Sequence, residues 1–309
     1  MSKSIVFTHT DIDGAVSYSV LCWFKQNKLP VKPISQADFK TFCKTSLTNK
    51  ISEFDKIYVL DLNVGDCVQC LDHPNVTIVD HHAESIEAAA AFKSAKVFCS
   101  DSTSTAMLLY KTLKNFNKKD FLTTKQKIIL LMADDYEQYT FKISSTRDLN
   151  NLFWSYQGDR VSKFYEEFKD GFTKFSEQQK NIINFYKKRV NSTIQDLKLY
   201  NTVLDIKDKK YNITSTFADF GINDVAEHVL KTVNTDIVIV INLKSERVSY
   251  RKNKNCDVKL NKLAKLLSDG GGHEDAAGGI LNDTFINFSK SFNEYELCKH
   301  KQDGNGPFA

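Results

Sequence analysis

Acidic and imidazole side chains follow short apolar segments at several places in this 309-residue chain. Segment 76–79 (Val-Thr-Ile-Val) ends in Asp80, His81 and His82, and Asp61 follows a second apolar run. Such runs, rich in β-branched residues, are typical of buried strands. In open α/β sheets, ligands bind outside the carboxyl ends of the parallel strands. The sequence therefore predicts a site that gathers these carboxylates and imidazoles at one edge of a parallel sheet.

The first apolar segment, residues 4–8, is followed by His9, Asp11, Asp13 and Gly14. Aspartates at positions i and i+2 of an extended segment project to the same side. Asp11 and Asp13 could therefore offer their carboxylates to one or two hard cations. Gly14 permits a tight turn into the helical pattern that follows. The alternative is a solvated turn with an aspartate as helix N-cap.

Carboxylates that converge at strand ends repel one another unless cations neutralise them. Oxygen and imidazole ligands without a thiolate suit Mn²⁺ or Mg²⁺ better than a structural zinc ion. Two such ions, about 3.5–4 Å apart, can activate a water and clamp both oxygens of an in-line phosphoryl displacement. A cationic group opposite would position the remaining phosphate. This chemistry predicts a phosphodiester hydrolase.

A glycine-rich motif lies near the end of the chain, where Gly270, Gly271 and Gly272 precede His273. Consecutive glycines leave backbone N–H groups uncovered, which is a common way to cradle an anion. A flexible linker would instead combine glycine and serine without a fixed histidine. We therefore expect Gly271, Gly272 and His273 to bind substrate.

Strand-like and helical segments alternate over the first part of the chain, which predicts a mostly parallel α/β sheet. At this length two domains are expected. We predict an N-terminal parallel-sheet catalytic domain with the metal site over 1–173, an amphipathic linker helix over 174–200, and a smaller C-terminal α/β domain over 201–309 that binds substrate.

Composition limits the class of protein. The formal charge of +4 is compatible with an anionic substrate but not typical of a protein that wraps DNA. There is no apolar run of about 18 residues, so we expect no membrane span. The N-terminus lacks signal-peptide character, and seven scattered cysteines favour a reducing cytoplasm. Cys67 and Cys70 have the spacing of a zinc or redox pair, although ordinary helix residues explain them as well.

In the order and spacing of five motifs, the chain resembles the DHH phosphoesterase superfamily over nearly its whole length. The motifs are Asp11-Ile-Asp13-Gly, Asp61 after a strand, Asp80-His81-His82, Asp134 after a helix, and Gly270-Gly-Gly-His273-Glu-Asp-Ala-Ala-Gly278. The last motif resembles the DHH-associated C-terminal domain of branches that degrade nanoRNA, cleave cyclic dinucleotides or digest single strands. The pyrophosphatase branch carries a different C-terminal domain.

The resemblance implies a binuclear manganese site, with Mg²⁺ or Co²⁺ as alternative ions. Asp11 would bind one ion and Asp13 the other, and Asp61 would bridge them. His81 and Asp134 would complete the second ion's ligands. Either His9 reaches the first ion or water takes that position, and Asp135 is the alternative to Asp134.

The resemblance also implies catalytic and substrate-binding roles. His82 would lie toward the substrate phosphate, and Asp80 would orient the imidazoles. Arg251 and His273 resemble the pair by which the second domain grips the phosphate or terminus of the substrate.

The expected function is hydrolysis of short oligonucleotides to mononucleotides. The alternatives are hydrolysis of cyclic or linear dinucleotides or of a nucleoside bisphosphate, then a single-strand exonuclease, then a nucleotide sensor without catalysis. We expect a short oligonucleotide or dinucleotide as partner, no membrane, and either a monomer or a homodimer. Phe153, Trp154 and Tyr156 could stack on bases, although aromatics at helical spacing more often belong to the core.

Overall fold

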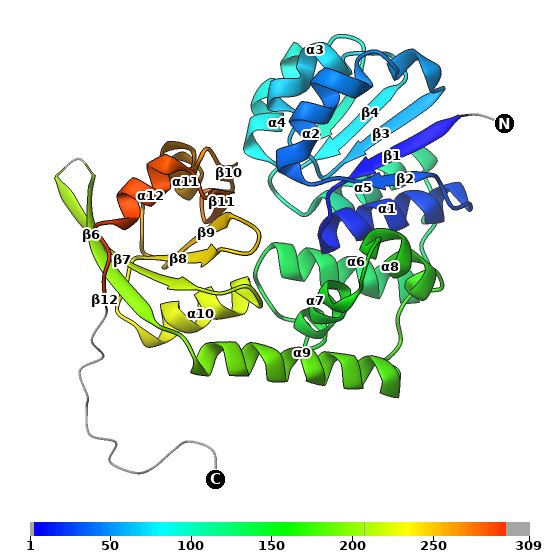
Figure 1. The fold of residues 1–309 in the computed structure, drawn as a ribbon. Coiled ribbons are helices and arrows are strands. Elements are labelled where there is room, and N and C mark those ends of the chain that lie inside the picture. Colours follow the sequence, from blue (N-terminus) through cyan, green and yellow to red (C-terminus); the bar gives the residue numbers. More distant parts are fainter. Residues whose placement is uncertain (1–2, 207, 295–309) are drawn as a thin grey trace. The chain divides into compact units, whose positions relative to one another are not determined.

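The computed structural model describes residues 3–206 and 208–294, and the chain forms two compact units (Figure 1). Unit 1 is Met1–Tyr186 and unit 2 is Lys187–Ala309, so the division falls inside helix α9 (Glu177–Gln195). The separate linker over 174–200 remains a proposal. No helix in the described part of the chain is both long and apolar enough to cross a membrane.

Unit 1 contains a five-stranded sheet with the order β2-β1-β3-β4-β5, in which every neighbouring pair is parallel. Its strands are β1 (Ser4–Thr8), β2 (Val31–Pro33), β3 (Lys56–Leu60), β4 (Val76–Asp80) and β5 (Lys96–Cys99). This sheet confirms the predicted parallel α/β architecture. It also brings the carboxyl ends of β1, β3 and β4 to one edge.

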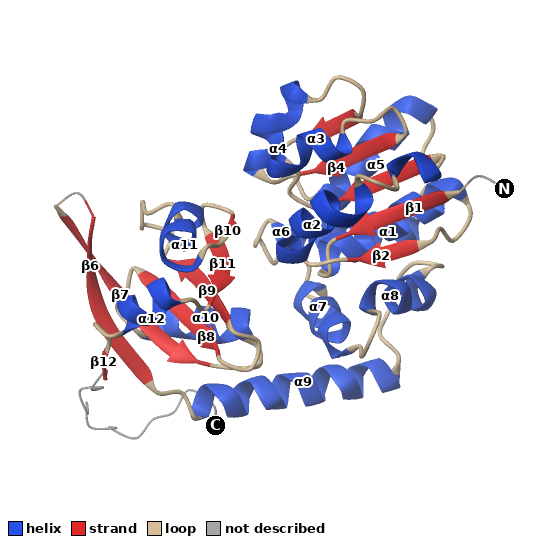
Figure 2. Cartoon of the chain, turned by 45° about the horizontal axis from the view of Figure 1, so that its top comes forward, coloured by secondary structure: helices blue, strands red, loops and turns tan. Residues whose placement is uncertain are grey.

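Helices cover both faces of this sheet (Figure 2). They are α1 (Ile12–Lys25), α2 (Gln36–Phe42), α3 (Val68–Leu71), α4 (Ala83–Ala88), α5 (Thr105–Asn117), α6 (Thr124–Glu137), α7 (Thr146–Ser155) and α8 (Arg160–Phe168). Successive strand residues face opposite sides. Val59 therefore packs with Phe39 of α2 in one core, whereas Leu60 packs with Leu21 of α1 in the other.

Unit 2 contains a seven-stranded mixed sheet with the order β10-β11-β9-β8-β7-β6-β12. Its strands are β6 (Leu199–Ile206), β7 (Lys209–Phe217), β8 (Ile237–Asn242), β9 (Arg247–Lys252), β10 (Gly271–Gly272), β11 (Ala276–Ile280) and β12 (Asn293–Glu294). Among the described strands of this second sheet, only β7 and β8 pair in parallel. Helix α10 (Ile222–Thr232) joins these two strands.

Alternation along β8 builds a core on each face of this second sheet. Ile239 packs with residues of α11 (Leu260–Ser268) and α12 (Asp283–Ser289), whereas Val240 packs with residues of α10. The second unit is therefore an α/β domain with its own cores, as the sequence predicts.

Candidate metal centre

The turn between β1 and α1 fixes the first two aspartates. Asp11 is the N-cap of α1, and its Oδ1 accepts a hydrogen bond of 3.0 Å from the backbone N–H of Gly14. A Cβ atom at position 14 would lie 2.4 Å from the carbonyl oxygen of His9, so only glycine allows this close approach. The tight turn therefore places His9, Asp11 and Asp13 at the sheet edge.

Asp61 is buried and has an unusual backbone conformation. It follows β3 with φ at +59°, a left-handed region that costs a non-glycine residue about 1–2 kcal/mol. Its N–H donates to the carbonyl oxygen of Val79 at 3.0 Å, and its Oδ1 accepts from Thr105 Oγ1 at 3.0 Å. Within residues 3–206 and 208–294, its Oδ2 has no hydrogen-bond partner. Such strain at a polar residue is characteristic of functional sites.

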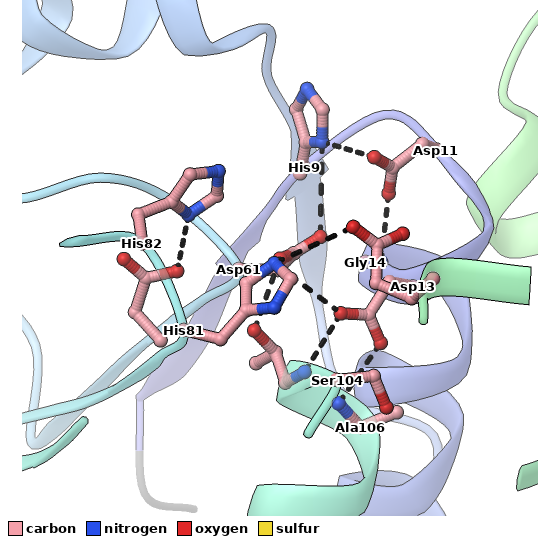
Figure 3. Close-up of polar contacts among 12 residues, drawn as sticks. His9, Asp11, Asp13, Gly14, Asp61, His81, His82, Ser104 and Ala106 are labelled. Carbon is pink, nitrogen blue, oxygen red and sulfur yellow. Dashed lines mark hydrogen bonds and ion pairs between the residues drawn. The ribbon is translucent and has the colours of Figure 1, made fainter. Parts of the chain in front are cut away.

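Two acid–imidazole clusters share the Asp61 carboxylate (Figure 3). In the first cluster, His9 Nδ1 lies 2.6 Å from Asp11 Oδ2 and 3.7 Å from Asp61 Oδ2. In the second, His81 Nε2 lies 3.4 Å from Asp61 Oδ1 and 4.0 Å from Asp13 Oδ2. The structure thus brings together five of the residues that the sequence predicts as metal ligands.

Asp13 is fully buried at the N-terminus of α5. Its two carboxylate oxygens accept hydrogen bonds from the backbone N–H groups of Thr105 and Ala106, at 2.8 and 3.0 Å. A helix N-terminus favours a negative charge. Helix α5 therefore holds Asp13 in place while one of its oxygens stays near His81.

Burial and like charge act together on these acids. Burial raises the pKa of Asp61 well above its usual range, and the charges of Asp13 and Asp11 raise it further. Burial also raises the pKa of Asp13. Against the effect of burial, the charge of His9 lowers the pKa of Asp11, and the charge of Asp11 raises the pKa of His9. His9 therefore compensates the negative charge of Asp11. The carboxylates of Asp13 and Asp61 repel each other.

Asp80 and His82 form a pair beside these clusters. His82 Nδ1 lies 2.7 Å from Oδ1 of Asp80, which is fully buried. Burial by itself would lower the pKa of His82, but the charge of Asp80 raises it. Asp61, Asp80 and His82 also form an acid–imidazole group. Asp80 thus lies within hydrogen-bond distance of one ring nitrogen of His82.

The residues of the site fit divalent cations. Asp61 Oδ2 and Asp80 Oδ2 are buried without a hydrogen-bond partner in the described part of the chain, and a buried orphan acceptor is costly. Cations would neutralise the negative charge of the converging carboxylates. They could also bind one of these unpaired oxygens as a ligand. Carboxylate and imidazole donors are those that Mn²⁺ and Mg²⁺ accept.

Asp134 and Asp135 lie near the end of α6, and each accepts hydrogen bonds from neighbouring segments of unit 1. Asp134 Oδ1 accepts hydrogen bonds from Thr103 Oγ1 at 2.7 Å and from the N–H of Ser104 at 2.9 Å. Asp135 is buried and binds the loop that follows α6. Neither aspartate belongs to an acid–imidazole group among the described residues.

Glu137, one helical turn after Asp134, lies at the second cluster instead. Its Oε1 is 3.7 Å from His81 Nε2, and its charge contributes, after burial, to the raised pKa of Asp13. Sequence reasoning missed Glu137 because the motif pointed to the adjacent aspartates. The i,i+3 spacing from Asp134, which puts both acids on one helix face, was the signal that could have found it.

The predicted substrate-binding residues lie in unit 2. Arg251 of β9 donates from Nη2 to Asn223 Oδ1 at 2.6 Å and from Nη1 to the carbonyl oxygen of Tyr250 at 2.7 Å. Its side chain is thereby held in one orientation.

The glycine-rich motif is a short β-hairpin. Gly271 and Gly272 of β10 pair with Gly278 and Ala277 of β11. The N–H of His273 donates to the carbonyl oxygen of Ala276 at 2.8 Å. Gly271 and Gly272 are thus paired strand residues, whereas the sequence analysis expected glycines with uncovered backbone N–H groups. The pairing was not visible in the sequence because glycine disfavours strands.

Solved structures of similar fold are known, although no protein-family model and no curated protein matches the sequence. The pGpG-specific phosphodiesterase PggH from Vibrio cholerae is 12% identical, over 93% of this chain and 96% of its own, with a TM-score of 0.55. RecJ from Thermus thermophilus in complex with Mn²⁺ is 12% identical, over 94% of this chain and 51% of its own, with a TM-score of 0.59.

A third structure is described as the DHH domain of a member of a family of ribosomal proteins. It is 9% identical, over 95% of this chain and 83% of its own, with a TM-score of 0.55. The likeness extends over nearly all of this chain in each case. Together with the parallel sheet of unit 1 and the mixed sheet of unit 2, it shows that the chain shares the fold of these structures.

Proposed function

We propose that the protein is a Mn²⁺-dependent phosphodiesterase of the cytoplasm that hydrolyses short oligonucleotides to mononucleotides. The observation that carries this proposal is the pair of acid–imidazole clusters that share the buried Asp61. A shared carboxylate between two clusters is the arrangement that a two-metal site requires. The fold that the chain shares with RecJ and PggH supports the same class of chemistry, because these proteins are an exonuclease and a phosphodiesterase.

His9 and Asp11 would hold one cation, and Asp13, His81 and Glu137 the other, with Asp61 between them. In this proposal Glu137 takes the place that the resemblance gave to Asp134. Bound divalent cations supply a lowered pKa for the attacking water and neutralise charge on the phosphoryl oxygens.

The proposed role of His82 follows from its contact with Asp80. Because Asp80 holds Nδ1 at 2.7 Å, the ring is fixed in one orientation and its charged form is favoured. A protonated His82 would donate from Nε2 to a phosphate oxygen of the substrate, where negative charge develops during hydrolysis. Asp80 is the positioning residue in this pair.

Arg251 and His273 would bind a second phosphate or the terminus of the substrate. A guanidinium that is already held by Asn223 loses little rotamer freedom when it binds an oxyanion. The paired glycines Gly271 and Gly272 place His273 at the end of a hairpin. A guanidinium and an imidazole N–H can both donate hydrogen bonds to phosphate oxygens, which suits a short substrate whose free end is a phosphate.

Hydrolysis of a linear dinucleotide is the second candidate. The structure described as a pGpG-specific phosphodiesterase matches this chain over nearly the full length of both proteins, whereas this chain spans about half of RecJ from Thermus thermophilus. The shared length favours a dinucleotide over a long single strand.

A product time course with Mn²⁺ would separate these candidates. The substrates are end-labelled RNA of three to five nucleotides, linear pGpG as the two-nucleotide RNA, a cyclic dinucleotide, a 20-nucleotide single-stranded DNA and pyrophosphate. We expect mononucleotides from the short RNA at the highest rate. A clear preference for pGpG or for the cyclic dinucleotide would replace the oligonucleotide proposal. Binding of nucleotides without cleavage of any substrate would identify a sensor.

A further inference from the structure

The loop between α6 and α7, residues 138–145, follows Glu137 directly and carries the exposed Tyr139 and the half-buried Phe141. We infer that this loop is a nucleobase-binding site, in which a base of the substrate stacks on Tyr139. The inference rests on the proposed function, because it assigns a base-binding subsite to the same phosphodiester centre.

Two aromatic residues of the loop have left-handed backbone conformations. Tyr139 has φ at +54° and Phe141 has φ at +49°. Non-glycine residues avoid this region because the Cβ atom crowds the following carbonyl oxygen. At Tyr139 this conformation ends helix α6, because the N–H of Tyr139 donates to the carbonyl oxygen of Tyr136 at 3.0 Å and the N–H of Thr140 to that of Asp135 at 3.1 Å. The Tyr139 side chain is 46% exposed.

Asp135 holds the loop in this conformation. Its Oδ1 accepts hydrogen bonds from Thr140 Oγ1 at 2.5 Å and from the N–H of Lys142 at 2.8 Å. Its Oδ2 accepts from the N–H of Ile143 at 3.0 Å and from Thr146 Oγ1 at 2.7 Å. One buried carboxylate thus fixes the backbone on both sides of Phe141. The loop is preorganised for a ligand, which lowers the entropic cost of binding.

The aromatic side chains support one another edge to face. The ring centroids of Tyr139 and Phe141 are 4.5 Å apart at 69°, and those of Tyr136 and Phe141 are 5.8 Å apart. The Arg147 guanidinium lies 3.6 Å from the centroid of Phe141. The half-buried Phe141 therefore braces the Tyr139 ring, and Arg147 adds positive charge beside it. Aromatic rings with a neighbouring arginine are the surfaces on which bases stack.

The loop lies within reach of the phosphodiester centre. Tyr139 follows Glu137 by two residues, so their Cα atoms are at most about 7 Å apart. Glu137 itself lies 3.7 Å from His81 across the second cluster. A nucleotide whose phosphate binds at the clusters thus has an aromatic ring close by for its base. Of the aromatics that we considered from the sequence, Phe153 is fully buried in the core.

Stacking on one ring recognises the flat face that every base has, so the site would bind a base of any identity. The test is the affinity of a dinucleotide with a non-hydrolysable phosphonate linkage and 2-aminopurine as one base, whose fluorescence decreases on stacking. Titrations with Mn²⁺ compare the wild type with Tyr139→Ala, Tyr139→Phe and Phe116→Ala, which removes an exposed aromatic from α5. A second ligand replaces the same base by an abasic residue.

We expect Tyr139→Ala to weaken binding of the base-bearing ligand about fivefold to 150-fold and to abolish the quenching, the range expected when one stacked base is lost. Tyr139→Phe and Phe116→Ala should bind as the wild type does. Binding of the abasic ligand should not change in any variant. Equal losses for both ligands, or wild-type affinity in Tyr139→Ala, would overturn the inference.

The binding test separates this inference from the proposed function. Base-dependent binding by a protein that cleaves no phosphodiester would contradict the proposed function and leave the stacking site in place. Cleavage of dinucleotides with unchanged binding by Tyr139→Ala would do the reverse. A wild type that neither binds nor cleaves dinucleotides would overturn both.

Discussion

At the scale of single residues, Asp61 combines two costs that a merely structural aspartate would not have. Its backbone is left-handed, and its carboxylate is buried between Asp11 and Asp13 with one oxygen unpartnered within the described residues. Burial and the two neighbouring charges raise its pKa well above the usual range. In the metal-free protein, Asp61 therefore lowers the stability of the folded state. Cations bound at this site would offset that cost.

Asp61→Asn should therefore stabilise the metal-free protein. A raised pKa in the folded state means that the carboxyl contributes stability at low pH, and that this contribution is lost as the pH rises through the folded value. In EDTA at pH 8 we expect the variant to be more stable by about 1–3 kcal/mol, with a smaller difference at pH 5. Urea unfolding at both pH values measures this. A variant less stable than the wild type at pH 8 would contradict the prediction.

Glu137 and Asp134 allow a matched comparison at the end of one helix. We expect Glu137→Gln to weaken the second of two Mn²⁺ binding events at least tenfold, because it removes a charge near His81 and Asp13. Asp134→Asn should retain both events and lose about 1 kcal/mol of stability, because Asp134 holds Thr103 and Ser104. Titration calorimetry of the two variants decides between the acids. Loss of a binding event in Asp134→Asn alone would restore the original assignment.

At the scale of structural elements, the site depends on the ends of the helices around it and on the loops next to those ends. Gly14 lets α1 start against the carbonyl oxygen of His9, and the N-terminus of α5 anchors Asp13. Near the C-terminal end of α6, Asp135 accepts hydrogen bonds from the N–H groups of Lys142 and Ile143 in the loop over residues 138–145. Each of these contacts joins a backbone group to a carboxylate or to a neighbouring backbone group.

Asp135→Asn should destabilise the protein in a pH-dependent way. Although burial raises its pKa, hydrogen bonds from Thr140, Thr146 and the N–H groups of Ile143 and Lys142 lower it to about 2. Since the folded pKa lies below the unfolded value of 3.8, the contribution is fully present above about pH 4 and is lost as the pH falls through 2. We expect a loss of roughly 2 kcal/mol at pH 7 that shrinks toward pH 2. Urea unfolding of wild type and variant from about pH 7 to about pH 2.5 checks this, and a constant difference would contradict it.

At the scale of the whole molecule, the chain divides into two units with separate hydrophobic cores. Every residue of the two clusters, and Glu137 as well, belongs to unit 1. Arg251 and His273 belong to unit 2. The residues proposed to bind metal and those proposed to bind substrate therefore belong to different units.

Binding of Mn²⁺ should stabilise unit 1 selectively. An ion present at 100 times its dissociation constant contributes about 2.7 kcal/mol to the state that binds it. Hydrogen exchange followed by peptide mass spectrometry should show slower exchange in peptides from residues 3–186, with peptides from 208–294 unchanged. Asp61→Asn is the control, in which neither set of peptides should respond. Equal protection of both sets by Mn²⁺ would contradict the assignment of the metal site to unit 1.

Sequence patterns were sufficient for those parts of the site that are local in the chain. Apolar runs that end in Asp61 or in Asp80-His81-His82 predicted parallel strands with acids at one edge, and the sheet confirms these strands. The left-handed conformation of Asp61 is set by tertiary contacts with Val79 and Thr105, which no local pattern reveals.

The parts that the sequence did not predict depend on contacts between distant segments. The position of Glu137 beside His81 follows from how α6 packs in unit 1, and Asp134 was the nearer match to the motif. Likewise, the pairing of Gly271 and Gly272 with β11 overrides the usual reluctance of glycine to form strands.

The most direct test of a two-cation phosphodiester centre around Asp61 is the Mn²⁺ dependence of mononucleotide release from an end-labelled RNA dinucleotide. Wild type and Asp61→Asn would be assayed side by side, with the fold of each checked by circular dichroism. We predict release by the wild type that rises with Mn²⁺ and stops in EDTA, and a loss of at least about 1,000-fold in the variant, which is about 4 kcal/mol of transition-state stabilisation. Release that persists in EDTA, or near-wild-type release by a folded Asp61→Asn, would contradict the assignment.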